Sequence, residues 1–284
     1  MSKNRSRVAA IAVISGISLL LAGCSPEAQR GFLPDASGVT NHTDRIIGLW
    51  TTSWIVLLAV GVASWGLMAW ALIVYRRRKG ETGMPAQLRY NLPIETLFTV
   101  VPLILVLGFF AFTARDMTAI EAKTENPDVH IEVIAKQWSW DFNYVDENTF
   151  DSGIQAQFTG TEENVFETLP TLYLPVNKSV QIDLSSRDVI HSFWVIDFLY
   201  KKDTFPGKTN YMYFTPQREG TYKGKCAELC GEYHSMMLFN VKVVSRAEFD
   251  AQMAALAAKG NTGQLDSSYD RNQNLPGNGS EGKG

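Results

Sequence analysis

Two long apolar segments constrain this chain more than any other feature of its sequence. Residues 49–75 (LWTTSWIVLLAVGVASWGLMAWALIVY) and residues 97–114 (LFTVVPLILVLGFFAFTA) contain no charged side chain. A helix needs roughly 20 consecutive apolar residues to cross the hydrocarbon core of a bilayer. The sequence therefore predicts two transmembrane helices, over residues 49–75 and 95–114, with the lipid bilayer as one partner of the chain.

The loop between the two segments indicates how they are oriented. Residues 76–94 begin with the basic run RRRKG and add Arg89. Because cytoplasmic loops carry an excess of Lys and Arg, this loop is expected in the cytoplasm and both ends of the chain on the outer side of the membrane.

The first residues have the features of an export signal. Lys3, Arg5 and Arg7 precede the apolar run VAAIAVISGISLLLAG, so residues 1–23 are interpreted as a signal peptide and residues 24–48 as an exported N-terminal segment. The sequence LAGC resembles a bacterial lipoprotein processing box, in which Cys24 is lipidated and becomes the mature N-terminus. The alternative is an ordinary signal peptide with an incidental cysteine.

The character of the chain changes after the second apolar segment. Short runs rich in Val, Ile, Tyr and Phe, such as VHIEVIAKQWSW and TLYLPVNKSVQIDL, alternate with turn residues. This pattern is typical of a sandwich or barrel and predicts one all-β domain over residues 117–245. Residues 246–259 have helical spacing, and residues 260–284 lack the apolar content to order themselves, which predicts a short helix and a disordered tail.

Composition excludes one class of partner. Only 19% of the residues are charged and the net charge is -3, so the chain has no bulk basicity suited to nucleic acid. Any ligand must therefore be recognised by a particular group of residues and not by the overall charge of the chain.

Soft metal ligands are concentrated in one stretch, KCAELCGEYHSMM. It contains two of the three cysteines of the chain. Its candidate ligands are Cys226, Cys230, His234, Met236 and Met237. Upstream, His191 lies between two strand-like segments, a position from which a histidine can reach this loop. Thiolate, thioether and imidazole donors suit copper, and a second cysteine beyond the single one of a blue-copper site suggests two copper ions that share both thiolates.

Three other interpretations of this stretch remain open. A structural zinc would be satisfied by Cys226, Cys230, His191 and His234, although it would leave no role for Met237. A disulfide between the two cysteines is possible in an oxidising compartment, although it would close a very small loop. Core packing would explain either methionine by itself.

At these residues the sequence closely resembles the copper-binding subunit II of haem-copper cytochrome c oxidases. The family pattern is a distant His followed by C-x-E-x-C-x-x-x-H-x-x-M, and the matching residues here are His191, Cys226, Glu228, Cys230, His234 and Met237. The resemblance extends from the helix hairpin through the β domain. It implies an N-terminal two-helix transmembrane hairpin followed by an all-β cupredoxin-like Greek-key barrel that carries a dinuclear copper centre, CuA.

The resemblance also implies the role of each ligand. Cys226 and Cys230 would bridge the coppers, His191 and His234 would supply one imidazole each, and Met237 would bind one copper. The main-chain carbonyl of Glu228 would bind the other copper, and its side chain would bind a magnesium ion at the interface with subunit I. Met236 would be a neighbour only.

As a function, the resemblance implies a subunit of an aa3-type oxidase in the bacterial plasma membrane, with the copper domain on the outer face. Electrons from cytochrome c, or from a haem c domain of a respiratory supercomplex, would pass through the copper pair to haem in subunit I. Oxygen would be reduced to water there, coupled to proton pumping, and subunits I and III would be partners. The haem would lie only in subunit I, because the remaining histidines here, His42 and His130, are expected at the surface or in packing.

Three further residues acquire roles from the same resemblance. Trp138 would mark the point where electrons enter, and Asp188 matches an acidic position where cytochrome c docks. Glu95 matches a glutamate at the mouth of a proton-uptake path, although a carboxylate in the first turn of a helix is also favoured by the helix dipole.

Residues 141–170 carry acidic side chains without a single Lys or Arg. Such a surface can steer a basic cytochrome c and raise its association rate. A solvated loop is the equally acceptable alternative. The acidic residues that follow Asp141 are Asp146, Glu147, Asp151, Glu162, Glu163 and Glu167.

Two other classes of protein fit parts of this sequence. A copper assembly or storage protein would hold one exchangeable copper, and the complete ligand set argues against it. Subunit II of a quinol oxidase shares the hairpin and the barrel, but that branch lacks the copper ligands found here.

Overall fold

The computed structural model describes residues 25–80, 82–84, 87, 89–156, 165, 167–268 and 270. Two compact units contain these residues. One contains Ile47–Ala119 and the described residues up to Phe32, and the other contains Leu33–Ile46 and everything described from Ile120 onward. The expected signal peptide and Cys24 lie outside the described residues.

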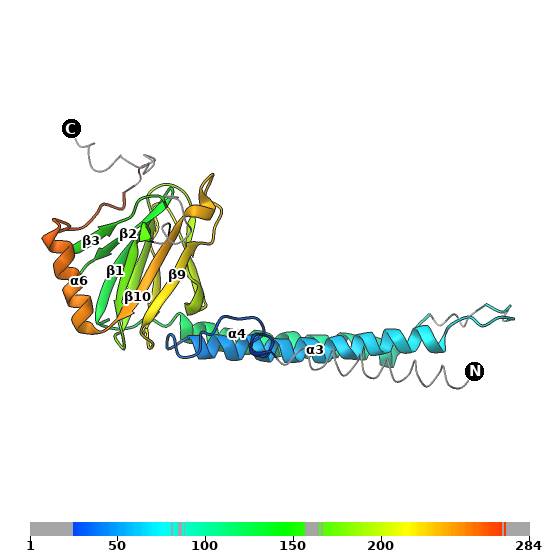
Figure 1. Cartoon of the computed structure of the whole chain (residues 1–284). Helices are drawn as coiled ribbons and strands as arrows, with labels where there is room; N and C mark the ends of the chain where they lie inside the picture. Colours follow the sequence, from blue (N-terminus) through cyan, green and yellow to red (C-terminus); the bar gives the residue numbers. More distant parts are fainter. Residues whose placement is uncertain are drawn as a thin grey trace, which may run out of the picture. The chain divides into compact units, whose positions relative to one another are not determined.

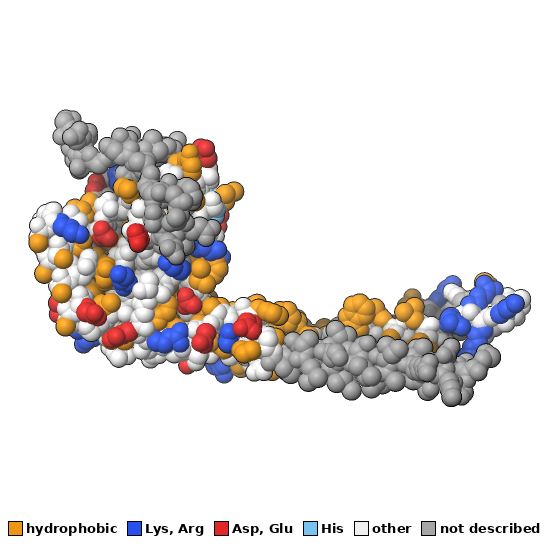
Figure 2. All heavy atoms as spheres, viewed as in Figure 1, with side chains coloured by type: hydrophobic (Ala, Val, Ile, Leu, Met, Phe, Trp, Pro, Cys, Tyr) orange, Lys and Arg blue, Asp and Glu red, His pale blue; other side chains and the backbone are white. Residues whose placement is uncertain are grey.

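Two long helices dominate the first unit. α3 spans Thr43–Val74 and α4 spans Leu92–Ile120, and a short helix, α2 (Pro26–Gln29), precedes them. Large apolar side chains remain exposed along both long helices, and Figure 2 shows them in orange. Helices of 32 and 29 residues with this composition are long and apolar enough to cross a membrane. The predicted pair of apolar helices is therefore confirmed.

Both helices are longer than the charge-free segments. α3 begins before residue 49, and its first turn contains Asp44, a carboxylate that the helix dipole favours there. α4 begins before residue 95: Asn91 Oδ1 accepts the Ile94 N–H at 3.4 Å, and Glu95 Oε1 accepts the Asn91 N–H at 2.9 Å. Capping residues thus extend a helix past the apolar run that identifies it, and α4 also continues beyond residue 114 to Ile120.

The named elements in the described part of the second unit are short strands, the helix α6 and the 3-10 turns η1 and η2. The strands are β1 (Val129–Lys136), β2 (Ser139–Tyr144), β3 (Thr149–Ser152), β4 (Thr171–Pro175), β5 (Val180–Ser186), β6 (His191–Val195), β7 (Tyr200–Thr204), β8 (Asn210–Phe214), β9 (Gly220–Cys226) and β10 (Leu238–Val244). The helical segments are η1 (Ile196–Phe198), η2 (His234–Met236) and α6 (Arg246–Ala258).

These strands form two five-stranded sheets that pack face to face (Figure 1), with the orders β3-β2-β1-β5-β8 and β4-β10-β9-β6-β7. β1 pairs with β5 and β10 pairs with β4 in parallel, and the other neighbours are antiparallel. Alternate residues of β1, such as Ile131 and Val133, are fully buried against the opposite sheet. The result is the predicted all-β, cupredoxin-like fold.

Aromatic side chains fill the space between the sheets. Trp140 contacts Phe193 and Phe239 with ring centroids 5.6 and 5.3 Å away, and the two phenylalanines stack on each other at 4.8 Å. Gly224 makes this stack possible, since a Cβ at that position would lie 2.2 Å from the Phe239 ring. The aromatic core therefore reaches the end of β9, where the candidate metal ligands begin.

The segment after β10 contains a capped helix, and residues beyond that helix contact the β domain. α6 begins with a complete capping box formed by Ser245 and Glu248. Beyond it, Asn143 donates to the Leu265 carbonyl and accepts the Leu265 N–H, both at 2.9 Å, and Asp270 bonds Arg187. Polar bonds thus join Leu265 and Asp270, in the first part of the expected disordered tail, to the β domain, and the disorder of the tail stays a prediction.

Candidate metal centre

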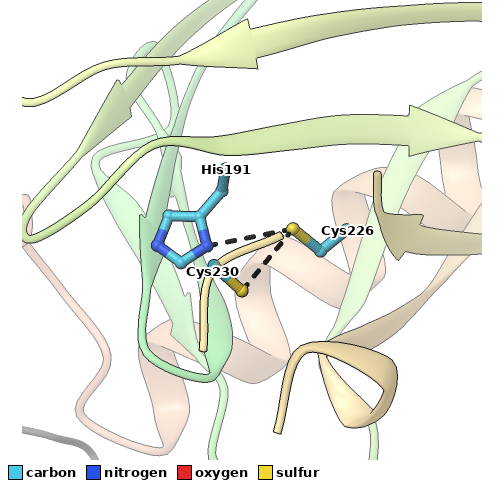
Figure 3. Close-up of side chains that lie close together, drawn as sticks. All are labelled: His191, Cys226 and Cys230. Atoms are coloured by element: carbon cyan, nitrogen blue, oxygen red, sulfur yellow. Dashed lines mark hydrogen bonds between the residues drawn. The ribbon is translucent and has the colours of Figure 1, made fainter. Parts of the chain in front are cut away.

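The strand pairing brings two of the candidate ligands to one end of the second sheet. His191 is the first residue of β6 and Cys226 is the last residue of β9. These strands are antiparallel neighbours, with Phe193 opposite Cys226. Cys230 follows on the loop after β9. Figure 3 shows the imidazole of His191 and the thiols of Cys226 and Cys230 pointing toward one another.

The five side-chain donors of the family pattern lie close together. They are His191, Cys226, Cys230, His234 and Met237. The Cys226 Sγ lies 3.9 Å from the Cys230 Sγ and 3.9 Å from the His191 Nδ1. The Cys230 Sγ lies 3.5 Å from the His234 Nδ1 and 3.8 Å from the Met237 Sδ. The ligand atoms of His191, Cys226 and Cys230 all lie within 4.8 Å of one another. This spacing leaves room for cations between the donors.

A main-chain oxygen adds a sixth donor to this cluster. The Glu228 carbonyl lies 3.2 Å from the Cys226 Sγ, while the Glu228 side chain belongs to an exposed residue. Met236 has a different environment, since it packs against the small apolar cluster of Ala156, Val165 and Leu169. The two adjacent methionines are therefore distinct, and only Met237, which is fully buried, faces the thiols.

The two thiols are free and have unequal acidity. Their separation of 3.9 Å is far from the ~2.05 Å of a disulfide bond. The hydrogen bond between Cys226 and Cys230, and then that between Cys226 and His191, lowers the pKa of Cys226, although burial opposes the shift. The bond to Cys226, together with burial, raises the pKa of Cys230. The cluster thus favours one thiolate, and a bound cation is needed to displace the second proton.

His191 is oriented by a carboxylate behind it. Its Nε2 lies 2.7 Å from the Asp188 Oδ1, which leaves Nδ1 directed at Cys226. Burial, the largest single effect, opposes protonation of His191, but Asp188 and the Cys226 thiolate together raise its pKa. Such a carboxylate fixes the ring and the tautomer of a metal-binding histidine. Asp188 is itself buried, so the structure places it beneath the site rather than on the open surface.

Trp138 packs against the same loop. It lies at the tip of the β1–β2 hairpin, is 5% exposed, and meets Tyr233 edge-on with ring centroids 5.0 Å apart. Gly231 has a φ of +127°, and a Cβ there would lie 3.0 Å from the Trp138 ring. The glycine after Cys230 therefore allows the indole to approach the cysteine loop closely.

The remaining predicted residues lie away from this cluster. Glu95 is exposed and caps α4, as described above. In the acidic segment, Glu147 and Asp151 are partly buried, and burial raises the pKa of both. Glu162 and Glu163 lie outside the described residues.

The two other histidines have structural partners. The His42 Nε2 bonds the Tyr213 carbonyl at 2.9 Å, and His130 lies 3.0 Å from the Asp183 carboxylate. Neither lies in the cluster.

Two hydrogen bonds to residues of the candidate centre cannot be predicted from the sequence. Gln137 bonds the Cys230 carbonyl, and Asp188 bonds His191. Asp188 stands three residues before His191, a spacing that suggests the bond only once His191 is known to be a ligand. Nothing near Gln137 in the sequence indicates its contact with Cys230, because the two residues are 93 positions apart.

Comparison with known proteins identifies relatives of this chain. Residues 129–244 match the family model described as cytochrome c oxidase subunit II, periplasmic domain. The chain is 44% identical to a probable cytochrome c oxidase subunit 2 of Streptomyces avermitilis, with 80% of each chain covered. It is 41% identical to the corresponding Streptomyces coelicolor protein, with 89% of this chain and 88% of that one covered.

Among solved structures, the periplasmic domain of cytochrome oxidase subunit II of Bradyrhizobium japonicum is similar. Its identity is 29% and its TM-score is 0.44, and the match covers 48% of this chain and 99% of that chain.

Two membrane-length helices and a cupredoxin-like domain with a buried histidine and cysteine cluster define a membrane-anchored protein with a copper-compatible site. The cluster is compatible with a CuA centre, because both thiols, both imidazoles and the thioether converge. The chain belongs to the cytochrome c oxidase subunit II family.

Proposed function

We propose that this chain is the copper-bearing subunit of a proton-pumping terminal oxidase, which receives electrons from cytochrome c and delivers them to haem in subunit I. The observation that carries the proposal is the convergence of five soft side-chain donors in one buried cluster. Zinc would leave the Met237 thioether unused, whereas copper accepts thiolate, imidazole and thioether together.

The proposed ligand set follows the geometry. Cys226 and Cys230 lie between the two imidazoles and would bridge two copper ions. His191 and His234 present Nδ1 to one thiol each, Met237 lies beside Cys230, and the Glu228 carbonyl lies beside Cys226. When bound, the copper pair would supply reversible one-electron oxidation and reduction. The chain's own residues would hold both cysteine sulfurs, and a complete ligand set would leave no open position for a substrate.

Other roles rest on the family resemblance and on position. Electrons would enter near Trp138, which lies against the cysteine loop. The exposed Glu228 carboxylate would bind magnesium at the interface with subunit I. Asp188 would contribute negative charge for cytochrome c docking from beneath the surface, and Glu95 would serve proton uptake when it is released from its capping bond to Asn91.

The membrane arrangement is part of the same proposal. The basic loop 76–94 would face the cytoplasm of a bacterium, and the copper domain would lie on the outer side of the plasma membrane. Export would use residues 1–23 as a signal peptide and lipidation of Cys24. Subunits I and III would be neighbours in the bilayer, and the donor would be cytochrome c or a haem c domain of a supercomplex.

Copper stoichiometry and electron paramagnetic resonance test the proposal directly. The full-length chain, purified in detergent and reconstituted with copper, is expected to bind two coppers that share one unpaired electron, seen as hyperfine coupling to both nuclei. A single copper, a preference for zinc, or a Cys226–Cys230 disulfide would instead indicate an assembly protein or a structural site.

Asp188→Asn is expected to weaken copper binding by about 10- to 100-fold, the usual cost of losing the partner that orients a metal-binding histidine. The variant loses the carboxylate that now lies 2.7 Å from the His191 Nε2. Competition with a chelator of known copper affinity measures the change. Asp183→Asn, on the outward face of β5, is the matched control. Equal copper affinities in the two variants would show that Asp188 does not orient the metal-binding histidine.

A further inference from the structure

Three separate loops meet at the candidate metal centre, and one residue bonds two of them. Gln137 lies at the tip of the β1–β2 hairpin. Its main-chain N–H donates to the Asp188 Oδ2 at 2.6 Å, and its side-chain Nε2 donates to the Cys230 carbonyl at 2.6 Å. The hairpin tip is thereby tied to the loop that precedes His191 and to the loop that carries Cys230.

The hairpin that carries Gln137 is firmly held. Lys136 pairs with Ser139 across the hairpin, so only residues 137 and 138 form its tip. Lys136 Nζ donates to the Asp141 Oδ1 at 2.6 Å and to the Ser152 Oγ at 3.2 Å, and the Lys136 and Asp141 side chains are 5% and 2% exposed. A buried ion pair with a further hydrogen bond thus lies at the base of the tip and connects β1 with β2 and β3.

The two bonds of Gln137 act on different ligands. The bond to the Cys230 carbonyl fixes the main chain of a bridging-position thiol. The bond to Asp188 holds the carboxylate whose other oxygen orients His191. Gln137, which is outside the ligand set, therefore contacts the main chain of Cys230 directly. It also contacts Asp188, whose other carboxylate oxygen bonds the His191 ring.

We infer that Gln137 is a positioning residue of this centre, which fixes Cys230 through its side chain and His191 through Asp188. The inference rests on the proposed copper function and adds to it a residue that touches no metal. Because the side-chain bond is directional, an apolar side chain of similar size cannot replace it, and the carbonyl of Cys230 would lose its donor.

Gln137→Leu tests the side-chain bond, since leucine fills similar space without a donor and leaves the main-chain bond to Asp188. We expect about 10- to 100-fold weaker copper binding by chelator competition, the range for partners outside the ligand set. At saturating copper, the hyperfine pattern should also change from that of the parent chain. A residue that only packs would lower the melting temperature of the metal-free chain and leave this pattern unchanged.

Gln217→Leu is the matched control, because Gln217 is an exposed glutamine outside the candidate centre. Should Gln137→Leu fail to fold, Gln137→Glu replaces it, as it keeps the shape and loses the amide donor. Copper affinity within twofold of the parent together with an unchanged hyperfine pattern would overturn the inference. A parent chain that lacks the two-copper spectrum would instead overturn the proposed function, so the two failures are distinguishable.

Discussion

Replacing Cys230 with serine is expected to abolish the two-copper centre and to stop turnover with cytochrome c. Cys230 contacts three other side chains of the donor set: its Sγ lies within 3.9 Å of Cys226, His234 and Met237. A serine hydroxyl is a hard, poorly ionised donor and does not replace a bridging thiolate. The loss of copper affinity should exceed the ~10- to 100-fold that partners outside the ligand set cost.

The measurement combines copper content, electron paramagnetic resonance and oxygen consumption of the assembled oxidase. Met236→Leu is the matched control, because Met236 packs in an apolar cluster instead of facing the thiols, and this variant should retain two coppers. A homogeneous Cys230→Ser preparation with two coppers and normal turnover would show that the bridging role is wrong.

Trp140→Ala is expected to lower the free energy of unfolding by about 3–5 kcal/mol, the usual cost of truncating a large buried aromatic side chain. The indole is fully buried, packs on Phe193 and Phe239, and donates to the Met237 carbonyl at 3.4 Å. It also meets the His191 ring edge-on at 6.2 Å. The cavity should therefore loosen the metal centre as well as the core.

Chemical unfolding of the full-length chain in detergent, followed by tryptophan fluorescence and far-ultraviolet circular dichroism, measures this change. Trp194→Ala is the comparison, since Trp194 is only partly buried and its ring lies 4.8 Å from the Lys225 ammonium. That variant should lose about 1 kcal/mol or less. Equal losses in the two variants would contradict the central role assigned to Trp140.

The sequence is sufficient to predict the apolar helices and the all-β class, because both depend on local composition and periodicity. It is not sufficient for the order of the strands. β1 lies beside β5 and β10 beside β4 in parallel, pairings between segments that are distant in the chain. Such pairings depend on how the sheets cover one another, which a single sequence does not specify.

The same division applies to the site. Cys226, Cys230, His234 and Met237 are predictable because one loop carries them at regular spacing, and their binding of copper stays a prediction. The position of His191 between two strand-like segments also makes it a candidate ligand. Gln137 is not predictable from the sequence, because its role depends on a hairpin tip that packs against a loop far away in the chain.

The register between β6 and β9 bears on how the protein is made in the cell. The main-chain ladder places Phe193 opposite Cys226, and His191 lies two residues before Phe193 on the same strand. Main-chain hydrogen bonds and aromatic packing therefore bring these two ligand-bearing strands together. Small zinc domains differ, since their folding energy comes from the metal itself. We therefore expect the β domain to be able to fold before copper binds, so that metal loading would be a separate step on sheets that are already formed.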